Sequence, residues 1–106
     1  MNPVKLLSLA VLGAVAMPAL AAEASADAAK SKISMCIGCH GIPGYRTTFP
    51  EVYHVPKIGG QHAAYIVAAL KQYKSGERDH PSMRGIAESL SEKDMADLAA
   101  YYGEKK

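Results

Sequence analysis

Two cysteines and a histidine form the most chemically specific run in the sequence. Cys36, Cys39 and His40 have the spacing C-x-x-C-H, which is the pattern of covalent c-type haem attachment. On a helical turn, residues three apart project from one face, so both sulfurs can reach the vinyl groups along one edge of a porphyrin. His40 then lies where its Nε2 can bind iron. The run predicts one haem c, covalently held by Cys36 and Cys39, with His40 as an iron ligand.

Three other uses of a C-x-x-C pair fit the chain less well. A thioredoxin-like site needs a βαβ setting, and the sequence has no run typical of a strand. Structural zinc usually has four Cys or His ligands, but there are only two cysteines, and His62 and His80 are scattered. A small disulfide loop would leave His40 unexplained. Haem attachment accounts for all three residues of the motif.

Helices joined by long loops must position this site. The sequence predicts one helix through Ile33 towards Cys39, a second over residues 61–74 that ends before Gly76, and a third that begins at Ser91. A short helical stretch starts near Met83. In the second helix the apolar residues recur with helical spacing, as do those of the third: Ile66, Leu70 and Tyr73, then Met95, Leu98, Ala99 and Tyr102.

The N-terminal segment reads as an export signal. Lys5 is followed by an apolar run from Leu6 to Ala16 and by Ala19-Leu20-Ala21, an A-x-A cleavage site. The run is shorter than the about 20 residues that span a bilayer. We therefore expect residues 1–21 to be cleaved and residues 22–106 to form a single soluble periplasmic domain, without stable membrane insertion.

Composition points to a core that needs a cofactor. The chain is 49% hydrophobic, but the signal inflates this figure, and the sequence has one Phe and no Trp. A domain so small and so poor in large apolar side chains usually needs a disulfide, a metal or a partner to complete its core. A net charge of +2 gives no basic field of the kind that nucleic-acid binding requires.

The ordered set of motifs resembles the class I c-type cytochromes, in particular small bacterial monohaem proteins and single halves of periplasmic dihaem cytochromes. The resemblance covers about residues 26–103. It implies an all-α cytochrome c fold, with three main helices, a short one and long loops wrapped around the haem. The matching segments are 36–41 (CIGCHG), 56–61 (PKIGGQ), 73–78 (YKSGER), Met83, 90–94 (LSEKD) and 99–102 (AAYY).

A sixth iron ligand must come from the other side of the ring. Met35 adjoins Cys36 on the proximal helix, and Met95 lies on the apolar stripe of the last helix, which leaves Met83. The sequence places Met83 in a loop between two helices, and the resemblance puts the methionine ligand there. Three histidines are rival ligands: His54, His62 and His80.

The resemblance also implies a supporting role for Pro56, whose carbonyl would accept the Nδ1 proton of His40 and so orient that ring. The loop of residues 43–55 is more aromatic than this part of the family usually is. Arg46, Tyr53 or His54 are candidates to bind a haem propionate, and ordinary surface packing is an equal alternative.

These residues predict electron transport without an enzymatic reaction. A haem iron held by His40 and Met83 would carry single electrons between redox proteins, for example from a dehydrogenase to a terminal oxidase or reductase. Two alternatives stay open: a haem c subunit of a dehydrogenase complex, and a ligand-binding or sensor haem protein with an open sixth position.

Overall fold

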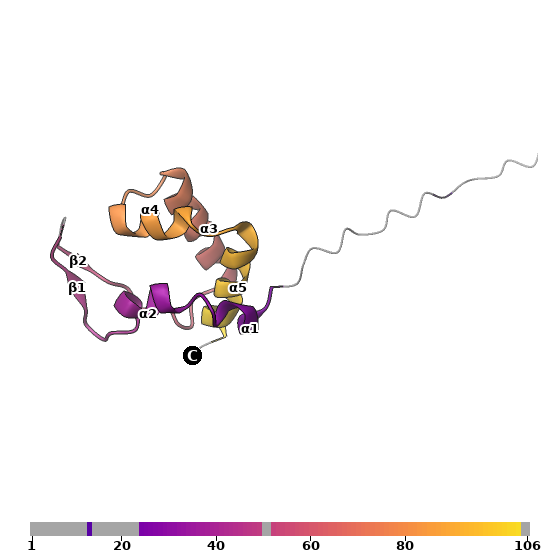
Figure 1. The fold of residues 1–106 in the computed structure, drawn as a ribbon, viewed down its shortest axis with the longest axis horizontal. Helices are drawn as coiled ribbons and strands as arrows, with labels where there is room; N and C mark the ends of the chain where they lie inside the picture. The colour runs from indigo at the N-terminus through magenta and orange to yellow at the C-terminus, as the bar shows by residue number, and fades with distance from the viewer. Residues whose placement is uncertain (1–12, 14–23, 50–51, 105–106) are drawn as a thin grey trace, which may run out of the picture.

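The computed structural model describes residues 13, 24–49 and 52–104. Apart from Gly13, the predicted export signal therefore lies outside the described residues. Five helices and two short strands follow in the order α1 Ala26–Ala29, α2 Ser34–His40, β1 Arg46–Thr47, β2 Tyr53–His54, α3 Ala63–Ser75, α4 Pro81–Glu88 and α5 Glu92–Gly103 (Figure 1). The expected all-α fold, with three main helices, a short one and long loops, is confirmed.

Helix α5 is the centre of the packing, because it lies against both α1 and α3 (Figure 1). Its apolar stripe is buried as its helical spacing requires. Seven buried apolar side chains from these three helices and from the connection between α4 and α5 form one cluster: Ala29, Ile66, Leu90, Met95, Leu98, Ala99 and Tyr102.

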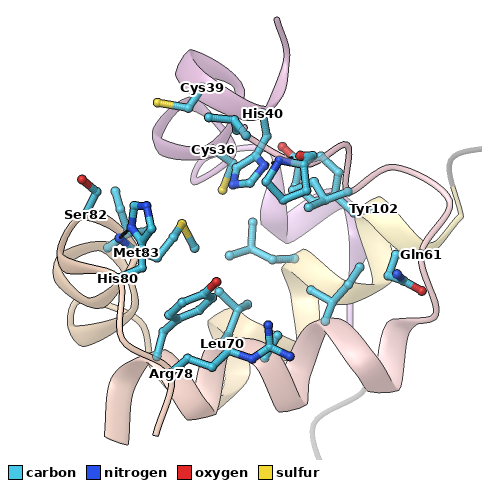
Figure 2. A pocket seen from close by; sticks show the side chains of 18 of the residues that line it. Cys36, Cys39, His40, Gln61, Leu70, Arg78, His80, Ser82, Met83 and Tyr102 are labelled. Carbon is cyan, nitrogen blue, oxygen red and sulfur yellow. Dashed lines mark hydrogen bonds between the residues drawn. The ribbon is translucent and has the colours of Figure 1, made fainter. Parts of the chain in front are cut away.

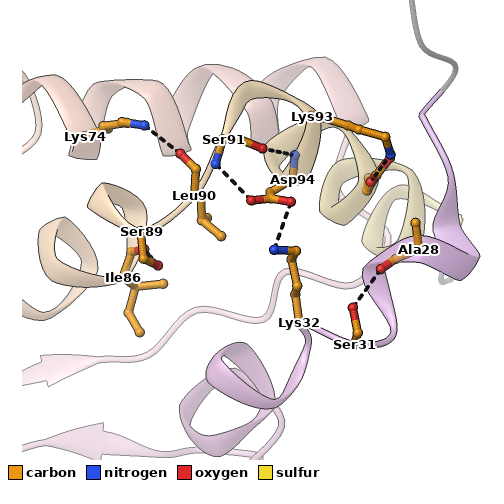
Figure 3. A network of polar contacts seen from close by, with 11 residues as sticks. Ala28, Ser31, Lys32, Lys74, Ile86, Ser89, Leu90, Ser91, Lys93 and Asp94 are labelled. Carbon is orange, nitrogen blue, oxygen red and sulfur yellow. Dashed lines mark hydrogen bonds and ion pairs between the residues drawn. The ribbon is translucent and has the colours of Figure 1, made fainter.

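Polar contacts fix the ends of the main helices. At the start of α5, the Ser91 hydroxyl accepts from the Asp94 backbone N–H, and the Asp94 carboxylate accepts from the Ser91 N–H, which completes the predicted capping box. Asp94 also pairs with Lys32 at 3.0 Å, which ties α5 to the segment before α2 (Figure 3). Helix α3 ends at Gly76, whose φ of 89° lies in the left-handed region that glycine readily adopts.

The structure corrects three local expectations. The segment 43–55 was expected to be a loop, but it contains a small antiparallel hairpin that pairs Arg46 with His54 and Thr47 with Tyr53. Strands of two residues are too short to give a periodic sequence signal. The first predicted helix is divided into α1 and α2 by a turn at residues 30–33.

Met83 lies within α4 and not in a loop. The helix begins at Pro81, with His80 as its N-cap. Proline suits the first position of a helix, because its missing N–H needs no partner there and its φ is already helical. The His-Pro pair was interpreted as part of a loop, whereas it starts the helix that carries Met83.

Candidate functional site

A cavity of about 590 Å³ lies between the cysteine-bearing helix and the rest of the domain. Its walls come from α2, the hairpin, the segment that precedes α3, and the helices α3, α4 and α5. The lining is mainly apolar, as is usual for a site that takes a small molecule. Every residue predicted to hold the haem lines it: Cys36, Cys39, His40, Pro56 and Met83.

Helix α2 presents the C-x-x-C-H run along one wall (Figure 2). Cys36 is half-buried and Cys39 is exposed, and burial raises the pKa of the Cys36 thiol. Gly41 is the C-cap of the helix, and a side chain there would meet the Ile37 carbonyl oxygen, which lies only 2.7 Å from the position of a Cβ. The close approach of the chain after His40 therefore favours glycine at this helix end.

The His40 ring is oriented by the chain itself. Its Nδ1 lies 2.6 Å from the carbonyl oxygen of Pro56, and because a carbonyl only accepts, Nδ1 carries the proton. Nε2 is then the unprotonated nitrogen, which is the form that binds a metal. This hydrogen bond is the contact that the resemblance implied for Pro56.

A second wall is formed by α4, from which Met83 extends towards the cavity (Figure 2). The His80 ring caps this helix, because its Nδ1 accepts from the Met83 backbone N–H at 3.3 Å. The same ring packs on Tyr53 of the hairpin, with 4.9 Å between centroids. The His80 cap, itself packed against the hairpin, thus fixes the first turn of α4. Sequence analysis did not find this role of His80.

The other candidates from the sequence separate into two groups. Tyr53, His54 and His80 line the cavity, whereas Arg46 and His62 are not among its lining residues. Arg46 is exposed on β1, and Met95 is buried in the core with an exposed fraction of 1%. The positions of these residues therefore favour Met83 over Met95 as an iron ligand. Of the three rival histidines, His54 and His80 line the cavity and His62 does not.

Tyr102 lines the cavity next to Cys36, where a haem would be attached. Apart from the neighbouring Cys36 thiol, its buried hydroxyl has no hydrogen-bond partner among the described residues, although a buried hydroxyl normally has one. Burial raises the pKa of Tyr102, and the neighbouring Cys36 raises it further. The phenol lies beside the thiol that would be joined to the ring. A mainly apolar cavity with Cys36, Cys39 and His40 on one wall fits a flat, largely apolar cofactor that is attached at that wall.

Two further features concern only the residues that the structure describes. Among these residues, no three side chains of His, Cys, Asp or Glu cluster as they would around a metal ion. Among the same residues no helix combines the length and the apolar character needed to cross a membrane.

Comparisons with known proteins place the chain among similar sequences. The family model described as Cytochrome c matches residues 25–102. Cytochrome c-554(548) of Halomonas halodenitrificans is 36% identical over 84 residues, which cover 76% of this chain and 96% of that protein.

Two longer relatives are matched over part of their length. Cytochrome c4 of Pseudomonas aeruginosa is 33% identical over 106 residues, all of this chain and 50% of that protein. The thiosulfate dehydrogenase electron acceptor of Thiomonas intermedia is 33% identical over 102 residues, 96% of this chain and 44% of that protein. The chain thus spans half or less of these two relatives.

Proposed function

Because this chain belongs to the cytochrome c family and carries one haem c on Cys36 and Cys39, we propose that it shuttles single electrons between redox proteins of the periplasm, with His40 and Met83 as iron ligands. Bound haem c supplies an iron that changes between ferric and ferrous states. One observation carries the proposal: a single cavity lies between His40, already oriented by Pro56, and Met83, already fixed by the cap of α4.

The surroundings of His40 and Met83 suit each residue to bind iron. The Pro56 carbonyl holds the Nδ1 proton of His40, which keeps Nε2 available and makes it more basic. The Met83 sulfur is neutral, and methionine opposite histidine raises the reduction potential. Leu70, Leu90 and Leu98 line the cavity between these walls and exclude water, which favours the less charged ferrous state.

The proposed role follows because His40 and Met83 would together hold the iron. No position on the iron then remains for a substrate or for oxygen, so the protein acts as an electron carrier and not as an enzyme. The domain would comprise residues 22–106 after cleavage of residues 1–21. Donor and acceptor would be redox proteins, such as a dehydrogenase and a terminal oxidase or reductase. The name of the Thiomonas intermedia relative supports a dehydrogenase as donor.

The visible spectrum of the ferric protein tests the ligand set. A bond from iron to methionine sulfur gives a weak absorption band in the red, and Met83→Ala should abolish it. Met95→Leu is the matched control, since it conserves volume at a core position and should leave the band unchanged. A band that persists in Met83→Ala would refute Met83 as the ligand. Rapid carbon monoxide binding by the reduced wild-type protein would refute the carrier role.

A further inference from the structure

The exposed apolar side chains that a haem would not cover gather in one segment. Met35, Tyr53 and Tyr65 are exposed but line the haem cavity. The other large apolar side chains that are exposed in the described part of the chain do not line that cavity, and they lie between α2 and β2: Ile37, Ile42, Phe49 and Val52. Exposed apolar groups that gather in this way are typical of a surface that binds a partner.

A groove of about 390 Å³ lies at this surface, beside the haem cavity. It is lined by residues 40–44, Val55 and Lys57. Ile37 adjoins it, because the Ile37 Cβ lies 3.2 Å from the place that a Cβ of Gly41 would take. Ile42, a lining residue, is 47% exposed. The groove thus offers an apolar surface that no side chain of the described residues covers.

Two cations stand at this groove without a partner among the described residues. Lys57 lines it, and Arg46 follows Tyr45, whose carbonyl oxygen accepts from the N–H of the groove residue Val55 at 2.9 Å. The other described Lys and Arg side chains all have ion pairs or hydrogen bonds: Lys30, Lys32, Lys71, Lys74, Arg78, Arg84 and Lys93. In the sequence, Glu51 is the only carboxylate residue between positions 28 and 76. The region is therefore cationic as well as apolar.

The groove adjoins the group that orients an iron ligand. Pro56, whose carbonyl oxygen lies 2.6 Å from the His40 Nδ1, stands between the groove residues Val55 and Lys57. His40 itself lines both the haem cavity and the groove. A protein seated in the groove would therefore touch the segment that holds His40. We call the groove, together with Ile37 and Arg46, the proximal groove.

We propose that the proximal groove is the docking surface for a redox partner whose contact face carries an apolar side chain surrounded by carboxylates. This inference rests on the proposed electron-carrier function. The apolar side chain would pack against Ile42, and the carboxylates would pair with Arg46 and Lys57. Charges at the rim of an interface speed the encounter more than they tighten the complex, and transient electron-transfer complexes need only a small contact area. Such a surface suits a carrier that binds and leaves quickly.

An electrode that presents the same chemistry as this partner tests the charged part of the groove. The probe is gold coated with a mixed monolayer of carboxylate-terminated and methyl-terminated alkanethiols. Voltammetry measures the amount of holoprotein that binds and exchanges electrons at low ionic strength. Arg46→Gln combined with Lys57→Gln should lower this amount by about fivefold or more. Salt at about 1 M should remove most of the difference from wild type, because it screens exposed charges.

Matched variants show whether the effect depends on position. Lys30→Gln combined with Lys71→Gln removes the same charge from two exposed sites outside the groove and the haem cavity, and should change the bound amount by less than about twofold. Lys57 also lines the haem cavity, whereas Arg46 does not. Arg46→Gln alone should therefore lower binding by about twofold with an unchanged midpoint potential, even if the double variant fails to mature.

The apolar part of the groove is tested by a substitution at Ile42. Ile42→Ser should lower binding to the mixed monolayer by about threefold, since burial of that side chain is lost. On a monolayer that carries carboxylates alone, Ile42→Ser should bind as well as wild type. The red absorption band should survive in every one of these variants.

Two results would overturn the proposal. One is equal binding of the Arg46 and Lys57 double variant and its matched control. The other is a dimer in sedimentation equilibrium that Ile42→Ser dissociates, because the groove would then hold a second copy of this chain. Carbon monoxide binding by the reduced wild type would refute the carrier role separately, since the electrode measurement needs only a haem that changes oxidation state.

Discussion

The two ends of the molecule are built differently. At one end, α1, α3 and α5 close on each other, and seven apolar side chains from these helices and the α4–α5 connection are buried. At the other end (Figure 1), none of the described residues of α2 and of the hairpin strands is buried, and α4 buries only Ala87. The first end is a helical frame that packs on itself, whereas the second consists of walls that face the haem cavity.

The difference shows which interactions stabilise each end. In the frame, burial of apolar side chains against one another provides the stabilisation. In the walls, side chains such as Met83 and Tyr53 face the cavity instead of packing into the buried cluster. The contacts missing from the walls are those that the haem provides, so the walls depend on the cofactor more than the frame does.

The largest effect on folding is expected when the haem is removed altogether. A chain with Cys36→Ser and Cys39→Ser should be largely unfolded, because neither the walls nor the remaining core suffices alone. Circular dichroism should show loss of most helix signal and of the cooperative thermal transition seen in the holoprotein. A stably folded apoprotein with native helix content would contradict the dependence of the walls on the cofactor.

A smaller effect on stability is expected from a substitution that leaves a cavity in the buried core of the frame. Met95 is 1% exposed in the core, so Met95→Ala should lower the free energy of unfolding by about 2–5 kcal/mol. Denaturant unfolding of the ferric protein measures this change. Its visible spectrum and potential should stay as in the wild type. Ile37→Ala, at an exposed wall position, is the control and should change stability far less.

A more local change concerns the cap that holds Met83. His80→Ala removes the acceptor of the Met83 N–H and the contact with Tyr53, and the loss of an N-cap costs about 1 kcal/mol. If α4 holds the ligand in place, imidazole should displace Met83 about fivefold more readily, as followed by the red absorption band.

Two variants check this interpretation. His80→Asn should restore much of the resistance to imidazole, since asparagine is a good N-cap. His62→Ala should have no effect, because the His62 side chain makes no cap hydrogen bond to α3. Equal displacement in His80→Ala and wild type would show that the cap does not position Met83.

The smallest predicted effect lies in the frame and depends on pH. Hydrogen bonds from Lys93, and then from the Ser25 backbone N–H, lower the pKa of Asp97 below its ordinary value of 3.8. A lowered carboxylate pKa stabilises the folded state above pH 3.8, and this stabilisation is lost as pH falls through the folded-state pKa. Asp97→Asn should therefore be less stable than wild type near neutral pH.

The measurement is the stability difference between Asp97→Asn and wild type as a function of pH. The difference should shrink below about pH 4 and vanish once the wild-type carboxylate is protonated. The red absorption band should be the same in both proteins throughout. A difference that stayed constant down to low pH would show that Asp97 does not act through its charge.

Much of the fold was predictable from local patterns. The stripe of α5, the capping box of Ser91 and Asp94, and the stop at Gly76 all follow from residues close together in sequence, because helix periodicity and helix ends are determined within a turn or two. The hairpin was missed because strand pairing joins Thr47 to Tyr53 across a loop. Local propensity carries little information on such a pairing.

The sequence alone determined the attachment chemistry, because Cys36, Cys39 and His40 are adjacent in the chain and their relative geometry is that of one helical turn. The tertiary structure decided which distant groups serve that motif. It brought the Pro56 carbonyl to His40, the Tyr53 ring to His80, and Arg78 to the cavity wall. These groups meet only when the helical frame forms, since their separation along the chain exceeds the range of any local pattern.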